Sequence, residues 1–173
     1  MNTRNLVLLS LLVGIGAVLH AVVPPILFGM KPDMLLSMMF LGILLIPKVK
    51  YVLLLSMLTG IVSALTTGVP GGQIANIIDK PVTAMMFLGL LLLMDKKIHR
   101  TISAPILAAF GTLISGSVFL MVALFILGLM EGGFITLFTA IVIPAAVVNT
   151  IVMVVVYPIT QGIMKRTKPL ANS

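Results

Sequence analysis

Hydrophobic residues fill the chain in long runs that short polar or proline-containing breaks separate. Runs of this kind are typical of helices that cross a bilayer, because about 20 apolar residues match the thickness of its hydrocarbon core. The pattern predicts an all-α integral membrane protein of six transmembrane helices, in a single domain over residues 1–173, with helices at 5–23, 33–46, 49–67, 73–94, 102–130 and 133–165.

Composition agrees with a membrane protein. The 173 residues are 60% hydrophobic and 9% charged, whereas soluble domains carry about 25% charged residues. The chain has no cysteine, which excludes disulfides and thiol chemistry. The first apolar run lacks a small-residue cleavage site, so we interpret it as a retained helix and not a signal peptide.

The basic residues predict the orientation. The formal net charge is +7, and all but two of the 11 lysines and arginines fall on one side of a six-span arrangement. Cytoplasmic loops concentrate Lys and Arg, so we expect a multi-pass protein of the cell membrane with both termini in the cytoplasm. The residues on this side are Arg4, Lys48, Lys50, Lys96, Lys97, Arg100, Lys165, Arg166 and Lys168.

The stretch "VVPPILFGMKPD" at 22–33 is apolar but rich in proline. It cannot form a regular helix, and irregular backbone at membrane depth must lie against protein or a wet cavity. We expect it to lie over the outer part of the bundle, with a kinked connection as the alternative. Residues 31–45 also resemble residues 80–92, which indicates either a repeat of two halves or chance similarity.

The fourth helix carries the clearest candidate site. Its polar residues are spaced i, i+3, i+4 and i+7, which places them on one helical face, and Pro81 removes the N–H that would bond the carbonyl of Ile77. Charge is costly at membrane depth, so these side chains either border a binding cavity or form a structural ion pair. The residues are Asn76, Asp79, Lys80 and Thr83.

Three polar residues elsewhere are further candidates. Asn149 lies in the middle of the sixth helix and needs a partner inside the bundle, either a ligand or a neighbouring helix. Lys31 and Asp33 lie before the second helix and are either binding residues or ordinary surface charges.

Small residues form a stripe on the first helix, with spacings of four, three and four. Such stripes let helices approach closely, so this one serves either internal packing or the docking of a partner membrane protein. Its members are Ser10, Gly14, Ala17 and Ala21.

No catalytic motif is present. The sequence contains no HExxH, no GxSxG, no Walker motif and no metal-ligand cluster. We therefore expect no enzymatic activity, no cofactor and no metal, and the basic charge is better explained by membrane orientation than by nucleic acid.

Several stretches together resemble the bacterial tryptophan transport protein (TrpP) family, namely "GIGAVLH", "GMKPDMLLSMMFLGILL", "TGIVSALTT" and "GQIANIIDKP". That family is grouped with the substrate-binding S components of energy-coupling factor (ECF) vitamin transporters. The resemblance implies an S-component fold and uptake of L-tryptophan through a pocket near the outer face. It also implies an ATP-driven ECF coupling module that docks on the first helix, but Ser10 and Gly14 stand where alanines would be expected.

Tryptophan makes demands that this sequence can meet. Its carboxylate needs a cation such as Lys80 or Lys31, its ammonium needs acceptors such as Asp79, Asn76 or Asp33, and its indole N–H needs an acceptor such as Asn149. The ring needs an apolar slot, for which the candidates are Phe28, Met30, Met85, Met86 and Phe87. Two alternatives are an S component for another small molecule, such as a vitamin, and a membrane scaffold without a ligand.

Overall fold

The computed structural model describes residues 2–24, 32–68, 72–94, 99–128 and 133–166. All regular structure in these ranges is helical. The elements are α1 (Thr3–Val22), α2 (Met34–Leu45), α3 (Val49–Thr66), α4 (Gly72–Met94), α5 (Arg100–Met121), the π-helical segment η2 (Val122–Ile126), α6 (Phe134–Leu137), the π-helical segment η3 (Phe138–Val142) and α7 (Ile143–Arg166).

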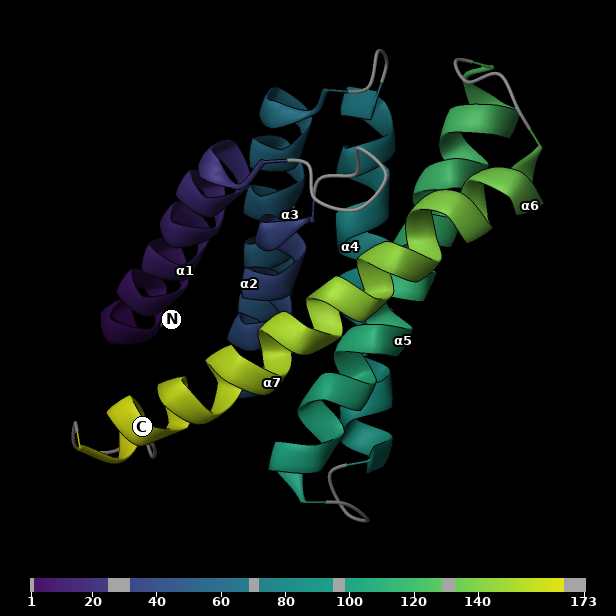
Figure 1. The fold of residues 1–173 in the computed structure, drawn as a ribbon. Coiled ribbons are helices and arrows are strands. Elements are labelled where there is room, and N and C mark those ends of the chain that lie inside the picture. The colour runs from purple at the N-terminus through teal and green to yellow at the C-terminus, as the bar shows by residue number, and fades with distance from the viewer. Residues whose placement is uncertain (1, 25–31, 69–71, 95–98, 129–132, 167–173) are drawn as a thin grey trace.

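The helices form a bundle around α2. Figure 1 shows α1, α2, α3 and α4 beside one another, with α7 running obliquely in front of the lower part of the bundle and α5 behind α7. The short helix α2 packs against α1, α3, α4, α5 and α7, and its residues from Met34 to Leu44 are all buried. The start of α1 and the end of α7 lie on the same side of the bundle (Figure 1).

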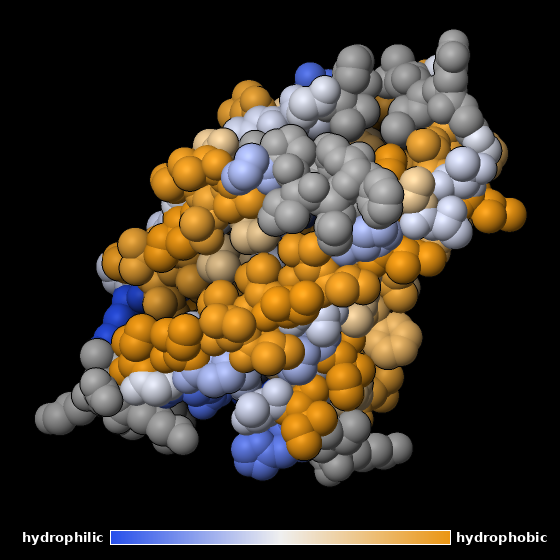
Figure 2. Space-filling model, in the orientation of Figure 1, coloured by the Kyte–Doolittle hydropathy of each residue, from blue (hydrophilic) through white to orange (hydrophobic). Residues whose placement is uncertain are grey.

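The surface is that of a membrane protein. Within the described residues, five helices are long and apolar enough to cross a membrane, and α2 is a shorter apolar helix. Hydrophobic side chains cover most of the face in Figure 2, and the most hydrophilic ones lie near its margins. The predicted bundle of six membrane helices is therefore confirmed.

The ends of α2 follow from local chemistry. The Asp33 side chain caps its N-terminus, since Oδ1 accepts a hydrogen bond of 2.9 Å from the backbone N–H of Leu36. Pro47, which has no N–H to donate, follows the last turn. The cap fixes the backbone at Asp33 and thereby fixes where its other carboxylate oxygen points.

The two similar segments meet in the core. Phe40 of α2 and Phe87 of α4 occupy the same place in the shared "MMFLG", and their rings stack with centroids 4.3 Å apart and planes 5° apart. Both rings are fully buried. A Cβ built on Gly111 of α5 would lie only 2.6 Å from the Phe40 ring, so a residue without a side chain is needed for this close approach.

The end of the fifth helical run differs from the expected one, whereas the sixth run keeps its expected bounds but contains a π-helical segment. The fifth helical run ends at Ile126, with η2 as its last turn, whereas the sequence predicted residue 130. The sixth run begins with α6 and η3 before α7. Each π-helical segment inserts an i to i+5 turn, which a hydrophobic pattern does not reveal. The predicted segment over the bundle falls largely on residues 25–31, which lie outside the described residues.

Candidate binding site

A cavity of about 460 Å³ opens between the helices of the bundle. Its wall is formed by residues from α1, the start of α2, α3, α4, α5, η3 and α7. This volume falls within the range of ligand pockets, which is about 300–1,000 Å³. One part of the wall carries charged and hydroxyl side chains and another part is apolar.

Lys80 joins two carboxylates at the polar part of the wall. Its Nζ lies 2.8 Å from Asp33 Oδ2 and 2.9 Å from Asp79 Oδ2. The Lys80 side chain is 3% exposed and that of Asp79 is fully buried, whereas that of Asp33 is 26% exposed. We call these three residues the charged cluster. Burial makes such charges costly unless they are paired, so each one stabilises the charged form of its neighbour.

Hydroxyl groups hold the Asp79 carboxylate in place. Thr83 Oγ1 donates to Asp79 Oδ1 at 2.7 Å, and Ser115 Oγ donates to Asp79 Oδ2 at 2.7 Å. The first bond runs along α4 and the second crosses from α5. Together with Lys80 they give this carboxylate three hydrogen-bond donors, so both of its buried oxygens are paired.

The groups of the charged cluster do not fully satisfy one another. An ammonium group has three donor hydrogens, and Lys80 uses two of them on Asp33 and Asp79. Among the described residues, no acceptor is recorded for the third hydrogen. The two carboxylates and one ammonium also leave one unit of negative charge within the cluster. A cationic donor and carboxylate acceptors thus lie together at one place on the cavity wall.

A second polar pair lies between α5 and α7. Asn149 Nδ2 donates to Thr112 Oγ1 at 3.2 Å, and Thr112 Oγ1 donates to the carbonyl of Ala108 at 2.8 Å. Asn149 is fully buried and lines the cavity. One of the two alternatives for Asn149, a hydrogen bond to a neighbouring helix, is thus present, and it is made by the N–H₂ group of the amide.

The predicted polar face of α4 is confirmed as a buried face. All four of its residues are at most 7% exposed. Asn76, Asp79 and Lys80 line the cavity, together with Asp33 and Asn149, while Asn76 also donates to the carbonyl of Gly72 at 2.9 Å. Candidates at Phe28, Met30 and Lys31 lie outside the described residues.

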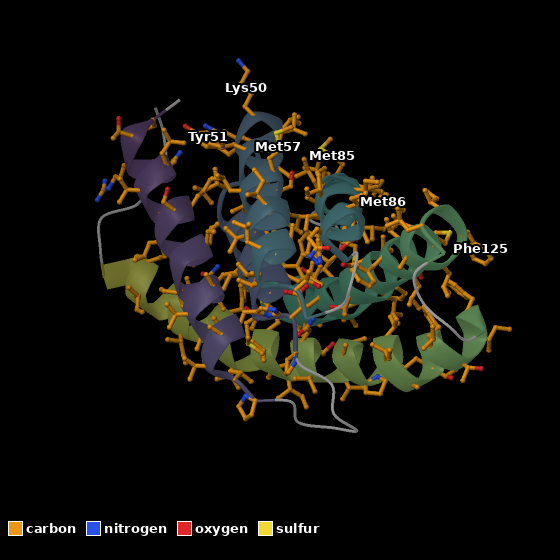
Figure 3. The ribbon with its side chains drawn as sticks, turned by 90° about the horizontal axis from the view of Figure 1, so that it is seen from above. Lys50, Tyr51, Met57, Met85, Met86 and Phe125 are labelled. Carbon is orange, nitrogen blue, oxygen red and sulfur yellow. The ribbon has the colours of Figure 1, made fainter. Side chains whose placement is uncertain are left out.

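The aromatic and methionine slot expected on α4 is wrong. Met85 and Met86 are 39% and 49% exposed on the outer surface, and Figure 3 shows them pointing away from the other helices. Phe87 stacks on Phe40 in the core and does not line the cavity. At about 100° per residue, position 85 lies on the opposite side of α4 from 79, 80 and 83. Met86 comes seven residues after Asp79 and lies at the edge of that same side, yet its side chain is exposed on the outer surface.

The apolar wall comes from elements that sequence reasoning missed. It is formed by Leu36, Phe119, Leu120, Ile141, Val142 and Ala145. Ser63, Thr112 and Ser115 also line the cavity and were not singled out. Their spacing carried a weak signal, since Thr112 and Ser115 are three residues apart on one face, but hydroxyl side chains are common in membrane helices.

The small-residue stripe of α1 faces outward for most of its length. Ser10, Gly14 and Ala21 are exposed and Ala17 is partly buried. A Cβ on Gly14 would meet no atom within 4 Å, so Gly14 is not required for packing within this chain. Docking of a partner on this stripe stays a prediction.

These features define a class: a multi-pass helical membrane protein with a cavity between its helices that polar and apolar side chains line. The sequence comparisons agree and are more specific. Residues 2–165 match the family described as "Tryptophan transporter TrpP", and the chain belongs to that family. The resemblance stated above is confirmed.

Relatives match over nearly their whole length. A "Probable tryptophan transport protein" of Bacillus subtilis is 55% identical over 167 residues, covering 96% of each chain. Proteins with the same description from Clostridium acetobutylicum and Clostridium perfringens are 41% and 34% identical, over 95% and 98% of this chain and 96% and 97% of theirs. No solved structure matches the chain. The fold likeness to ECF S components therefore stays a prediction.

Proposed function

We propose that this protein takes up L-tryptophan across the bacterial cell membrane and binds it in the internal cavity. The observation that carries the proposal is the charged cluster of Asp33, Asp79 and Lys80 on the wall of that cavity. The descriptions of its relatives support the same substrate.

The charged cluster suits the zwitterionic part of an amino acid. The remaining N–H of Lys80 is a donor for the substrate carboxylate. The hydroxyl of Ser63, which lines the cavity and is buried without a hydrogen-bond partner among the described residues, is a second donor. Asp33 is the more exposed of the two carboxylates and carries the negative charge that the substrate ammonium needs.

The apolar wall suits the indole ring. Phe119 and Leu120 of α5 lie on the cavity together with Ile141 and Val142 of η3. Burying an aromatic ring of this size in an apolar slot is favourable at roughly 25 cal/mol per Å² of area removed from water. A ligand with a charged head and an aromatic body therefore fits the division of the cavity wall.

Binding of radiolabelled tryptophan to the purified protein in detergent tests this function. We expect saturable binding that unlabelled tryptophan displaces. Tryptamine lacks the carboxylate and indole-3-propionate lacks the ammonium, so each should compete far less well because it leaves part of the charged cluster unmatched. A scaffold would give no saturable binding, and an S component for a vitamin would be stabilised by that vitamin and not by tryptophan.

The energy source is a separate part of the proposal. We propose cytoplasmic termini, on the grounds of the Lys and Arg distribution. Docking of an ATP-driven coupling module on the exposed face of α1 is supported only by the small residues there. Co-purification of this protein with such a module from the native membrane tests that partner.

A further inference from the structure

One buried acceptor in the cavity has no partner. The side-chain oxygen Oδ1 of Asn149 makes no hydrogen bond with any described residue, although Asn149 is fully buried. An unpaired acceptor inside a protein raises the free energy of the folded state unless something donates to it. Since Asn149 lines the cavity, a ligand there can supply the missing donor.

The hydrogen-bond chain fixes which atom of the amide is left over. Thr112 has a single hydroxyl hydrogen, and it goes to the carbonyl of Ala108 at 2.8 Å. The oxygen of Thr112 can therefore only accept from Asn149, so the atom that faces it must be the N–H₂ group. The free atom is then the carbonyl oxygen, which accepts hydrogen bonds and cannot donate them.

Asn149 lies on the same side of the helical run as two residues of the apolar wall. Ile141 and Ala145 precede Asn149 by eight and four residues, so all three lie along one side of the helical run, and all three line the cavity. A ring held against the apolar wall lies along the same face as Asn149. A single acceptor next to an otherwise apolar ring site suits a ring that carries one N–H.

We infer that Asn149 Oδ1 accepts the hydrogen bond of the indole N–H and selects tryptophan over aromatic amino acids whose rings lack a donor. The inference rests on the proposed function, because it concerns how the same cavity recognises the side chain. Thr112 acts as a positioning residue, since its hydroxyl holds the amide in the orientation that presents Oδ1.

The ligand pair that tests this differs in one group only. L-3-benzothienylalanine has a sulfur where tryptophan has the N–H, and it keeps the bicyclic ring and both charged groups. Calorimetric titration of the wild-type protein should give at least about tenfold weaker binding of the sulfur analogue, because it leaves the buried acceptor unpaired.

Two variants complete the test. Asn149→Leu has a side chain of similar size without an acceptor, so the ratio of the two affinities should fall toward one. Asn149→Ala takes its place if the leucine variant does not fold. Thr150→Val is the matched control: Thr150 is next to Asn149, bonds to the carbonyl of Ala146 at 2.6 Å and does not line the cavity, so its ratio should match the wild type.

The outcomes separate the two claims. Equal binding of tryptophan and the sulfur analogue by the wild-type protein overturns the role of Asn149. An unchanged ratio in the Asn149 variants overturns it as well, even if both ligands bind more weakly. Binding of neither ligand to the wild-type protein contradicts the proposed function and this inference with it.

Discussion

Lys80 Nζ lies 2.8 Å from Asp33 Oδ2, although the two residues are 47 positions apart in the sequence. This contact joins the capping residue of α2 to the middle of α4. Because Lys80 also bonds Asp79, one side chain links two helices and pairs with one buried and one partly exposed carboxylate. The charged cluster thus serves both the packing of the bundle and the wall of the cavity.

Replacing Lys80 by methionine should destabilise the protein. The change keeps the length of the side chain but leaves Asp79 and Asp33 without their shared cation. Breaking a buried ion pair by removing one partner costs about 3–5 kcal/mol. Thermal unfolding in detergent should show a clearly lower midpoint for Lys80→Met, with a smaller loss when Asp79→Asn is added, because the second change removes an unpaired charge.

Lys50→Met is the control for that prediction. Lys50 is exposed on α3 and projects away from the bundle in Figure 3. Its replacement should therefore change the unfolding midpoint as little as other surface substitutions do. Equal midpoints for Lys80→Met and the wild type would show that the ion pairs do not hold α2 and α4 together.

Sequence reasoning found the part of the site that lies on one helix. The spacing of Asn76, Asp79, Lys80 and Thr83 was sufficient, because helical periodicity alone places them on one face. The bundle of six membrane helices was equally accessible, since the length and apolar character of each run depend on local sequence.

The contacts of the candidate site that depend on packing between helices could not be predicted from helical periodicity. Nothing in the sequence pairs Asp33 with Lys80 or Ser115 with Asp79, because these contacts arise from how α2, α4 and α5 are arranged. The ring site was misplaced for a related reason. Met85 and Met86 were candidates because of their apolar side chains, but the arrangement of the helices leaves both exposed on the outer surface.

The stacked rings of Phe40 and Phe87 make the effect of a Gly→Ala substitution on thermal stability depend on which glycine is replaced. Gly111→Ala places a methyl group 2.6 Å from the Phe40 ring and 2.8 Å from the Phe87 ring, so the rings must shift. Overpacking of this kind costs about 1–3 kcal/mol. The thermal midpoint should fall.

Gly89→Ala supplies the comparison for the same substitution. A Cβ on Gly89 meets no atom within 4 Å, and alanine favours a helix more than glycine does. This variant should unfold at the same temperature as the wild type or higher. A midpoint for Gly111→Ala that equals that of Gly89→Ala would argue against the close approach of α5 to the ring stack.

The absence of cysteine makes the orientation directly measurable. Lys50→Cys and Gly68→Cys each introduce a single exposed thiol, near opposite ends of α3. With cytoplasmic termini, a membrane-impermeant maleimide added to intact cells should label Gly68→Cys and spare Lys50→Cys until the membrane is opened. The reverse pattern of labelling would invert the proposed orientation.

The most direct test of the account is a titration of tryptophan into purified wild-type and Asp79→Asn protein. The chain contains no tryptophan, so ligand fluorescence can be followed without background from the protein, and Thr150→Val serves as a folded control. Because Asp79→Asn removes a buried negative charge from the charged cluster and changes the bonds of Lys80, we predict saturable binding by the wild type and the control, and at least about tenfold weaker binding by Asp79→Asn. Equal affinity for tryptophan in all three proteins would contradict the claim that the charged cluster receives the substrate.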